Sequence, residues 1–118
     1  MPDSNDLQRH LPLNPRVFAL LLALLERPAH GYRLKQAVEE RSGGAVTIDP
    51  GSLYRMIAKL VDEGVVEEAA PPAGEAREDA RRRYYAVTEL GRRLAAAEAG
   101  RLRHLLAHAD DARLLAGG

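Results

Sequence analysis

The sequence contains no cysteine and no tryptophan, and few aromatic residues of any kind. Without cysteine there can be no disulfide bond and no thiolate metal site, which fits a protein of the reducing cytosol. Aromatic residues make up only 4% of the 118 residues. The core must therefore be built mainly from Leu, Val and Ala, and the length suits one small domain.

Long hydrophobic runs are missing as well. The longest, Val17–Leu25, is far shorter than the roughly 20 apolar residues that a transmembrane helix needs. The start of the chain, MPDSNDLQRHLPLNP, contains no basic segment followed by an apolar one, so we expect no secretory signal. We therefore expect a cytoplasmic protein that does not associate with membranes.

Residues suited to catalysis are scarce. The chain has three serines, no glycine-rich phosphate loop and no pair of carboxylates in an apolar context. We expect a protein that is not an enzyme and that needs no cofactor.

The charges are balanced overall but unevenly distributed. The formal net charge is zero. Residues 62–79 carry seven acids against one Arg, a net charge of −6, whereas residues 81–103 carry seven Arg against two Glu, a net charge of +5. Such a protein can present a basic face to an anionic partner while remaining neutral as a whole.

Two helices are predicted in the first third of the chain. Asn14 followed by Pro15 is a favourable helix start, and this helix should end at Arg27, before Pro28. Because it is apolar on nearly all sides, it should be buried. The segment AHGYRLKQAVEERSGG, residues 29–44, predicts a second helix that ends at its glycines. The inner side of this helix should carry Tyr32, Leu34, Ala37 and Val38.

A short strand and a third helix should follow. Ala45–Ile48 is rich in β-branched residues and predicts one small strand. In the next segment, DPGSLYRMIAKL, Asp49 is a cap and Pro50 takes the first helical position. Gly64 should end this helix. Apolar residues at helical spacing should face the core, namely Leu53, Met56, Ile57, Leu60 and Val61.

A hairpin and a long final helix complete the predicted order. Residues 65–70 and 81–87 should be strands around a loop at 71–80, and Thr88 should cap a helix that runs to about Leu115. The predicted fold class is mainly α with a small β-hairpin: a winged helix-turn-helix plus a long C-terminal dimerisation helix.

This order predicts two functional parts. Residues 1–88 would form an N-terminal arm and a winged helix-turn-helix DNA-binding domain, and residues 89–118 would form the dimerisation helix.

The outer side of the third helix is equipped for DNA. Ser52, Arg55 and Lys59 recur at helical spacing with Tyr54 beside them. A helix in the major groove needs donors for base edges and cations for phosphates. Arg55 is suited to a bidentate contact with guanine, and Lys59 is suited to a contact with phosphate. The alternative is an ordinary solvated face.

The second strand of the hairpin begins with a basic run, Arg81–Arg83. In a winged helix this run would lie against the DNA backbone or in the minor groove. Strand alternation predicts that Tyr84 and Tyr85 point to opposite faces, one inward and one outward. The alternative is a solvated edge whose charges block strand pairing.

The final helix has a wider apolar face than one small core requires. We expect it to form a homodimer, because a winged helix-turn-helix dimer binds two half-sites one helical turn apart. Packing within the monomer is the alternative. The predicted interface residues are Leu94, Leu102, Leu105 and Leu106.

His104 and His108 on the same helix are four residues apart, a spacing that suits metal ligands. Two histidines on one helical face are more often surface residues, and no third strong ligand accompanies them. We therefore predict no metal site, while a metal-responsive regulator stays as an alternative.

Three motifs together resemble the PadR family of bacterial transcriptional regulators: HGYRLKQAVEE, DPGSLYRMIAKLVDEGVVE and RRRYYAVTELGRRL. The resemblance covers roughly residues 11–106. It implies a dimeric winged-helix repressor whose C-terminal helix forms the dimer interface, as in the small subgroup with a single such helix.

Carried over by motif, the resemblance also implies particular DNA contacts. Many members have Pro where Arg55 stands, and the acidic GEARED segment departs from the more basic loops common in the family. We therefore expect Arg77 and the basic run Arg81–Arg83, rather than the loop tip, to contact DNA. The implied contacts are Ser52, Tyr54 and Arg55 in the recognition helix, and Arg82, Arg83 and Tyr84 in the wing.

The leading hypothesis is a dimeric, sequence-specific DNA-binding regulator, a repressor on a pseudo-palindromic operator that a small-molecule effector releases. Family members that bind flat aromatic drugs use a Trp of the last helix, and this chain has none. An effector would be held by aliphatic side chains and Tyr. The alternatives are a winged helix that binds an acidic protein partner and a metal-responsive regulator.

Overall fold

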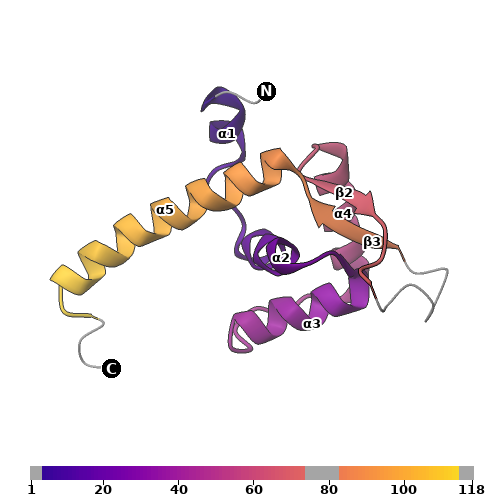
Figure 1. Ribbon diagram of the computed structural model, residues 1–118. Coiled ribbons are helices and arrows are strands. Elements are labelled where there is room, and N and C mark those ends of the chain that lie inside the picture. The colour runs from indigo at the N-terminus through magenta and orange to yellow at the C-terminus, as the bar shows by residue number, and fades with distance from the viewer. Residues whose placement is uncertain (1–3, 74–82, 115–118) are drawn as a thin grey trace.

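The computed structural model describes residues 4–73 and 83–114. Its elements (Figure 1) follow in the order α1 (Ser4–His10), α2 (Pro15–Glu26), β1 (Ala29–His30), α3 (Gly31–Arg41), α4 (Pro50–Asp62), β2 (Val66–Ala69), β3 (Tyr84–Val87) and α5 (Glu89–Asp111). The predicted fold class is confirmed: the structure is mostly helical with a small antiparallel sheet. No helix in the described parts of the chain is long and apolar enough to cross a membrane.

The helices begin where the sequence signals predict. The side chains of Asn14, Asp49 and Thr88 each accept a hydrogen bond from a backbone N–H in the first turn of the helix that they precede. These caps satisfy donors that have no partner within the helix. Helix α1 was not predicted, because its seven residues carry no helical apolar repeat.

The sheet has the strand order β1-β3-β2, and both pairings are antiparallel. The predicted hairpin is confirmed as β2 and β3. The third strand is β1, whereas the prediction of a strand at Ala45–Ile48 is wrong. Both edges of β3 are already paired, by β1 and β2, so residues 45–48 find no strand partner there.

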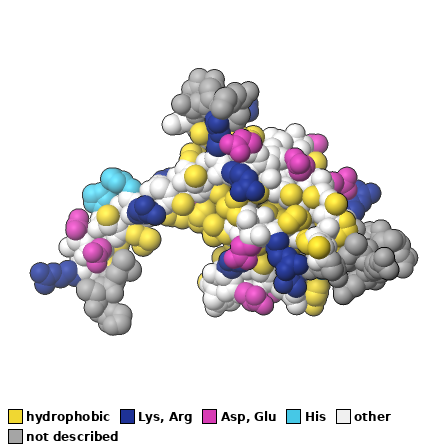
Figure 2. All heavy atoms as spheres, in the orientation of Figure 1, with side chains coloured by type: hydrophobic (Ala, Val, Ile, Leu, Met, Phe, Trp, Pro, Cys, Tyr) yellow, Lys and Arg dark blue, Asp and Glu magenta, His cyan; other side chains and the backbone are white. Residues whose placement is uncertain are grey.

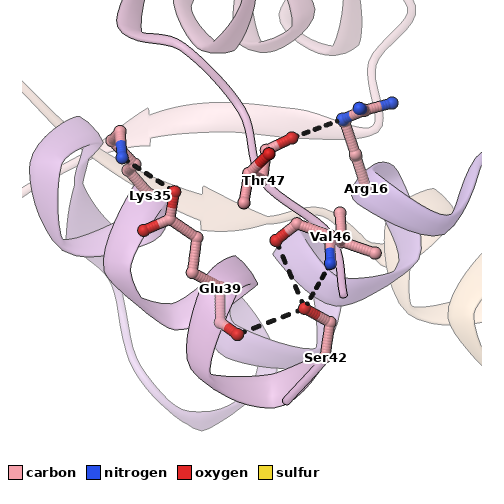
Figure 3. Close-up of polar contacts among 6 residues, drawn as sticks. All are labelled: Arg16, Lys35, Glu39, Ser42, Val46 and Thr47. Carbon is pink, nitrogen blue, oxygen red and sulfur yellow. Dashed lines mark hydrogen bonds and ion pairs between the residues drawn. The ribbon is translucent and has the colours of Figure 1, made fainter. Parts of the chain in front are cut away.

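Residues 42–49 instead form an ordered connection between α3 and α4 (Figure 3). The Ser42 hydroxyl accepts a hydrogen bond from the Val46 N–H at 2.9 Å and lies 3.1 Å from the Glu39 carbonyl oxygen, to which it donates. Arg16 Nε donates to the Thr47 carbonyl at 2.9 Å. These bonds fix the start of α4 relative to α2 and α3.

The core lies among α2, α3, α4, the sheet and the first half of α5. Its fully buried large side chains are Leu20, Leu21, Leu34, Val38, Leu53, Ile57, Val65, Val66 and Leu94. Two predicted core residues lie outside it: Tyr32 is 63% exposed and Val61 is 38% exposed. Tyr32 falls on the side of α3 opposite Leu34, which the helical spacing of about 100° per residue explains.

Helix α5 has two halves with different surroundings. Gly91, Leu94, Ala95 and Glu98 are buried against the rest of the domain. Figure 1 shows the distal half projecting beyond α2 and α3. A Cβ at Gly91 would overlap the Val65 carbonyl and the Val87 side chain, so only glycine allows α5 to approach the sheet this closely.

Candidate nucleic-acid interface

The start of α4 is held by a compact polar network. Asp49 Oδ1 accepts the Ser52 N–H at 2.8 Å, and Oδ2 accepts the Ser52 hydroxyl at 2.7 Å. These two hydrogen bonds lower the pKa of Asp49 below its ordinary value of 3.8. Ser52 is half-buried and engaged in this cap, so its side chain orders the helix start as well as facing outward.

Arg55 lies at the centre of the exposed face of α4. Its Nη2 donates to the Ser52 hydroxyl oxygen at 3.0 Å, and the side chain is otherwise exposed. This is one charge-assisted hydrogen bond to a neutral hydroxyl, whereas guanine would offer the same guanidinium two acceptors. The bidentate contact to a base edge can therefore replace the bond to Ser52.

Tyr54 lies against Gly31 at the start of α3. A Cβ on Gly31 would come within 2.7 Å of the Tyr54 hydroxyl oxygen and 2.8 Å of its ring, although the Tyr54 side chain is still 52% exposed. The glycine of the HGY motif and the tyrosine of the SLY motif thus form one packing unit. Sequence reasoning found both motifs but not this contact, because it joins residues far apart along the chain.

The exposed face of α4 has a groove on each side. On one side, a groove of about 280 Å³ separates the helix from the hairpin and includes Tyr54, Ala58 and Arg83. Arg83 is exposed and lies 3.4 Å from Glu68 of β2. On the other side, Ser52 and Lys59 border a groove that reaches the start of α2.

Tyr84 does not belong to the exposed surface. It is only 4% exposed, and its ring meets His30 edge to face, with the ring centres 5.3 Å apart. Tyr85 is also buried, at 8% exposure, and burial raises its pKa above the ordinary 10.0. The prediction that one of the two tyrosines points outward is wrong, because β1 pairs with β3 and brings His30 over Tyr84.

The remaining predicted wing contacts, Arg77, Arg81 and Arg82, lie outside the described residues. Among the predicted DNA contacts that the structure describes, Ser52, Tyr54, Arg55, Lys59 and Arg83 lie around one surface.

The distal half of α5 leaves an apolar stripe uncovered. Leu105 is 51% exposed and Leu106 is 53% exposed, and Leu102 is half-buried. Figure 2 shows hydrophobic side chains along the side of α5 that faces α2 and α3. Leu94, by contrast, is fully buried within the monomer, so its assignment to the dimer interface is wrong.

His104 and His108 are exposed, and their rings meet edge to face with centres 5.0 Å apart. Within residues 4–73 and 83–114, no group of three or more His, Cys, Asp or Glu residues is placed to hold a metal ion. The pair therefore has the spacing of two metal ligands without a third.

Glu98 is a buried charge that sequence reasoning missed. It is only 2% exposed, accepts the Leu13 N–H at 3.2 Å, and pairs with Arg101 through bonds of 2.8 and 2.7 Å. These contacts, the Arg101 bonds above all, lower the pKa of Glu98 below 4.5. Two sequence signals were present: Glu98 lies on the same helical face as Leu94 and Leu102, and Arg101 follows it at the spacing of a helical ion pair.

The helix-turn-helix of α3 and α4, followed by the β2–β3 hairpin, defines a winged-helix protein. The model of the PadR-like family of transcriptional regulators matches residues 20–97. The chain belongs to this family, as its three motifs predicted, and family and fold are those of transcriptional regulators rather than enzymes.

Solved structures share the fold. A PadR family transcription regulator from Clostridium difficile R20291 matches with a TM-score of 0.68 and 15% identity, over 83% of this chain and 97% of that one. Bacillus subtilis PadR in complex with operator DNA matches with a TM-score of 0.57 and 22% identity, over 73% of this chain and 46% of that one.

The matches to curated relatives cover only part of each relative's length. An uncharacterized 37.1 kDa protein in a Streptomyces fradiae transposon is 34% identical over 73% of this chain, which spans 22% of that relative. The chain spans 64% of an uncharacterized Lysinibacillus sphaericus protein.

Proposed function

We propose that this transcriptional regulator is a dimeric, sequence-specific DNA-binding repressor acting in the cytoplasm. The observation that carries the proposal is the exposed face of α4, where Tyr54, Arg55 and Lys59 lie along a helix whose start is ordered by Asp49 and Ser52. A major-groove reader requires such a face: base-edge donors at the centre and cations at the margin.

In this proposal α4 enters the major groove. Arg55 exchanges its hydrogen bond with Ser52 for a bidentate contact to guanine. Lys59 contacts phosphate, and Ser52 and Tyr54 contact phosphate or sugar. Arg83, with Arg77, Arg81 and Arg82 of the same hairpin, contacts the flanking backbone.

Dimerisation would occur through the exposed stripe of α5. Leu105 and Leu106 are half-exposed leucines on a surface that water solvates poorly. A two-fold pair of α5 helices would place two α4 helices in successive major grooves of a pseudo-palindromic operator. A small-molecule effector held between these helices by aliphatic side chains would alter the spacing and release the DNA.

The test is binding to a duplex from the upstream region of the protein's own gene, measured by fluorescence anisotropy. We expect specific binding that Arg55→Ala weakens by about 1–3 kcal/mol while binding to unrelated DNA changes little. The matched control is Arg103→Ala, which also removes one exposed Arg but lies on the distal half of α5. Failure of the wild-type protein to prefer this duplex over unrelated DNA at any salt concentration contradicts the proposal and favours a protein-binding winged helix.

A metal-responsive form of the same regulator is the second candidate, supported by the 5.0 Å ring contact of His104 and His108. Titration with zinc would then change DNA affinity, and His104→Ala would abolish the change. A DNA affinity that zinc does not alter removes this candidate.

A further inference from the structure

The structure assigns a further DNA contact that the sequence motifs do not mark: Arg16, at the start of α2, together with Lys59 of α4. We propose that these two cations bind a backbone phosphate on the side of α4 opposite the hairpin. The inference rests on the proposed DNA-binding function and adds a second flank to the interface.

The first argument is the position of the groove. It has a volume of about 660 Å³ and lies between the starts of α2 and α4, with Arg16, Thr47, Ser52 and Lys59 in its lining. Ser52 and Lys59 are seven residues apart and share one side of α4. Tyr54 and Ala58 border the hairpin groove on the other side. The exposed Arg55 lies between the two sides, at the centre of the face.

The second argument is the geometry of DNA. A helix in the major groove has a phosphate backbone on each side, one from each strand. The hairpin, with Arg83, can meet only one of them. The groove that contains Arg16 lies along the other side of α4, where the second strand would pass.

The third argument is the state of the Arg16 side chain. Its Nε–H donates to the Thr47 carbonyl at 2.9 Å, and Figure 3 shows the two Nη atoms pointing away from that loop. Within the described residues, Arg16 forms no ion pair. A guanidinium held by one bond is fixed in place, and its remaining N–H groups suit a bidentate phosphate contact.

The charges of the groove favour an anion. Arg16 and Lys59 are its cations, and Asp49 is the only acid in its lining. The Asp49 carboxylate accepts the two hydrogen bonds from Ser52 at the helix start and attracts Arg16 without forming an ion pair with it. The local net charge is +1, in a protein whose total charge is zero.

The experiment compares Arg16→Ala, Arg16→Gln and Arg16→Lys with the wild-type protein, using the upstream duplex and an unrelated duplex of equal length. We expect Arg16→Ala and Arg16→Gln to weaken binding to both duplexes by about tenfold, and to reduce the slope of log affinity against log salt by about 0.9 per subunit. Arg16→Lys should restore most of the slope. Arg103→Ala is the matched control for losing a positive charge.

The outcomes separate the two proposals. If the wild-type protein shows no specific DNA binding, the proposed function fails and this inference fails with it. If the wild-type protein binds but Arg16→Ala leaves the salt slope unchanged, only the phosphate contact is overturned. If Arg16→Ala lowers the melting temperature but leaves the salt slope of DNA affinity unchanged, Arg16 only stabilises the loop that contains Thr47.

Discussion

A contact between two single residues joins the HGY and SLY motifs of this chain. Gly31 has no side chain, and Tyr54 occupies the space that a Cβ would need. The glycine is therefore favoured by the position of a side chain of α4, more than twenty residues away, rather than by its own backbone angles. Sequence reasoning could place both residues in helices but could not join them, since their contact depends on how α3 crosses α4.

This contact gives a prediction about Gly31→Ala. The added methyl group would displace the far end of the half-exposed Tyr54 ring, so we expect the free energy of unfolding to fall by up to about 1 kcal/mol, measured by urea denaturation. In a Tyr54→Ala background the same substitution should cost much less, because the obstacle is gone.

Gly100→Ala is the matched control. Nothing lies within 4 Å of a Cβ at this position in α5, so the substitution should stabilise the helix by about 0.5–1 kcal/mol. Equal losses at Gly31 with and without the Tyr54 ring would contradict the packing explanation.

Glu98 gives a prediction about pH. Its pKa is lowered in the folded protein, so its contribution to stability is complete above the ordinary value of 4.5 and is lost as the pH falls through the folded value. We expect Glu98→Gln to lower the free energy of unfolding by about 1–3 kcal/mol near pH 7. The difference from wild type should shrink below pH 4.5.

The control for this measurement is Glu89→Gln, which breaks the exposed pair with Arg93 on the same helix. Exposed pairs of this kind contribute only a few tenths of a kcal/mol. A Glu98→Gln effect that stays constant from pH 7 to pH 3 would show that the charge of Glu98 plays no part.

At the scale of elements, local signals predicted most of the fold. The caps Asn14, Asp49 and Thr88 mark three helix starts, and the apolar repeat of α4 marks its inner face. The wrong predictions concern which segments pair as strands of the sheet. The two residues of β1 are a strand only because β3 lies beside them, and residues 45–48 have strand-forming side chains but no partner.

The candidate site was predictable to the same extent. The helical repeat identified the outer residues of α4, whereas Tyr84 was misjudged because strand alternation says nothing about what covers each face. Arg16 contacts Thr47 and Glu98 contacts Leu13, partners distant in sequence that no local pattern marks, whereas the pair of Glu98 with Arg101 has ordinary helical spacing.

The uncovered stripe of α5 gives a prediction about assembly. Leu105→Lys should place a charge in the proposed dimer interface and shift the protein from dimer to monomer at micromolar concentration, measured by sedimentation velocity. Ala107→Lys adds the same charge on the opposite side of this exposed half-helix and should leave the dimer intact. A wild-type protein that sediments as a monomer contradicts the dimer proposal.

At the scale of the whole molecule, a net charge of zero does not mean that DNA affinity is independent of salt concentration. Residues 81–103 and 62–79 carry opposite charges, so a basic surface and an acidic one coexist. DNA affinity responds to the phosphates contacted and not to total charge. A dimer with six or more phosphate contacts should lose about 10³ in operator affinity between 50 and 200 mM salt.

The measurement is a salt titration of operator binding by anisotropy, with the melting temperature followed over the same range. The melting temperature should change little, because the core contains few charges. An affinity that is flat across this range would contradict a phosphate-based interface.

The junction before α5 makes that helix a lever. The Thr88 hydroxyl shares its proton between the carbonyls of Gly64 and Val65, which lie two and three residues past the end of α4, so the root of α5 is fixed close to the end of α4. A helix of 23 residues is about 34 Å long. A tilt of only about 5° at the root therefore moves its far end by about 3 Å. In the proposed dimer, a small displacement at the far end of α5 would therefore rotate α4, the helix proposed to read DNA.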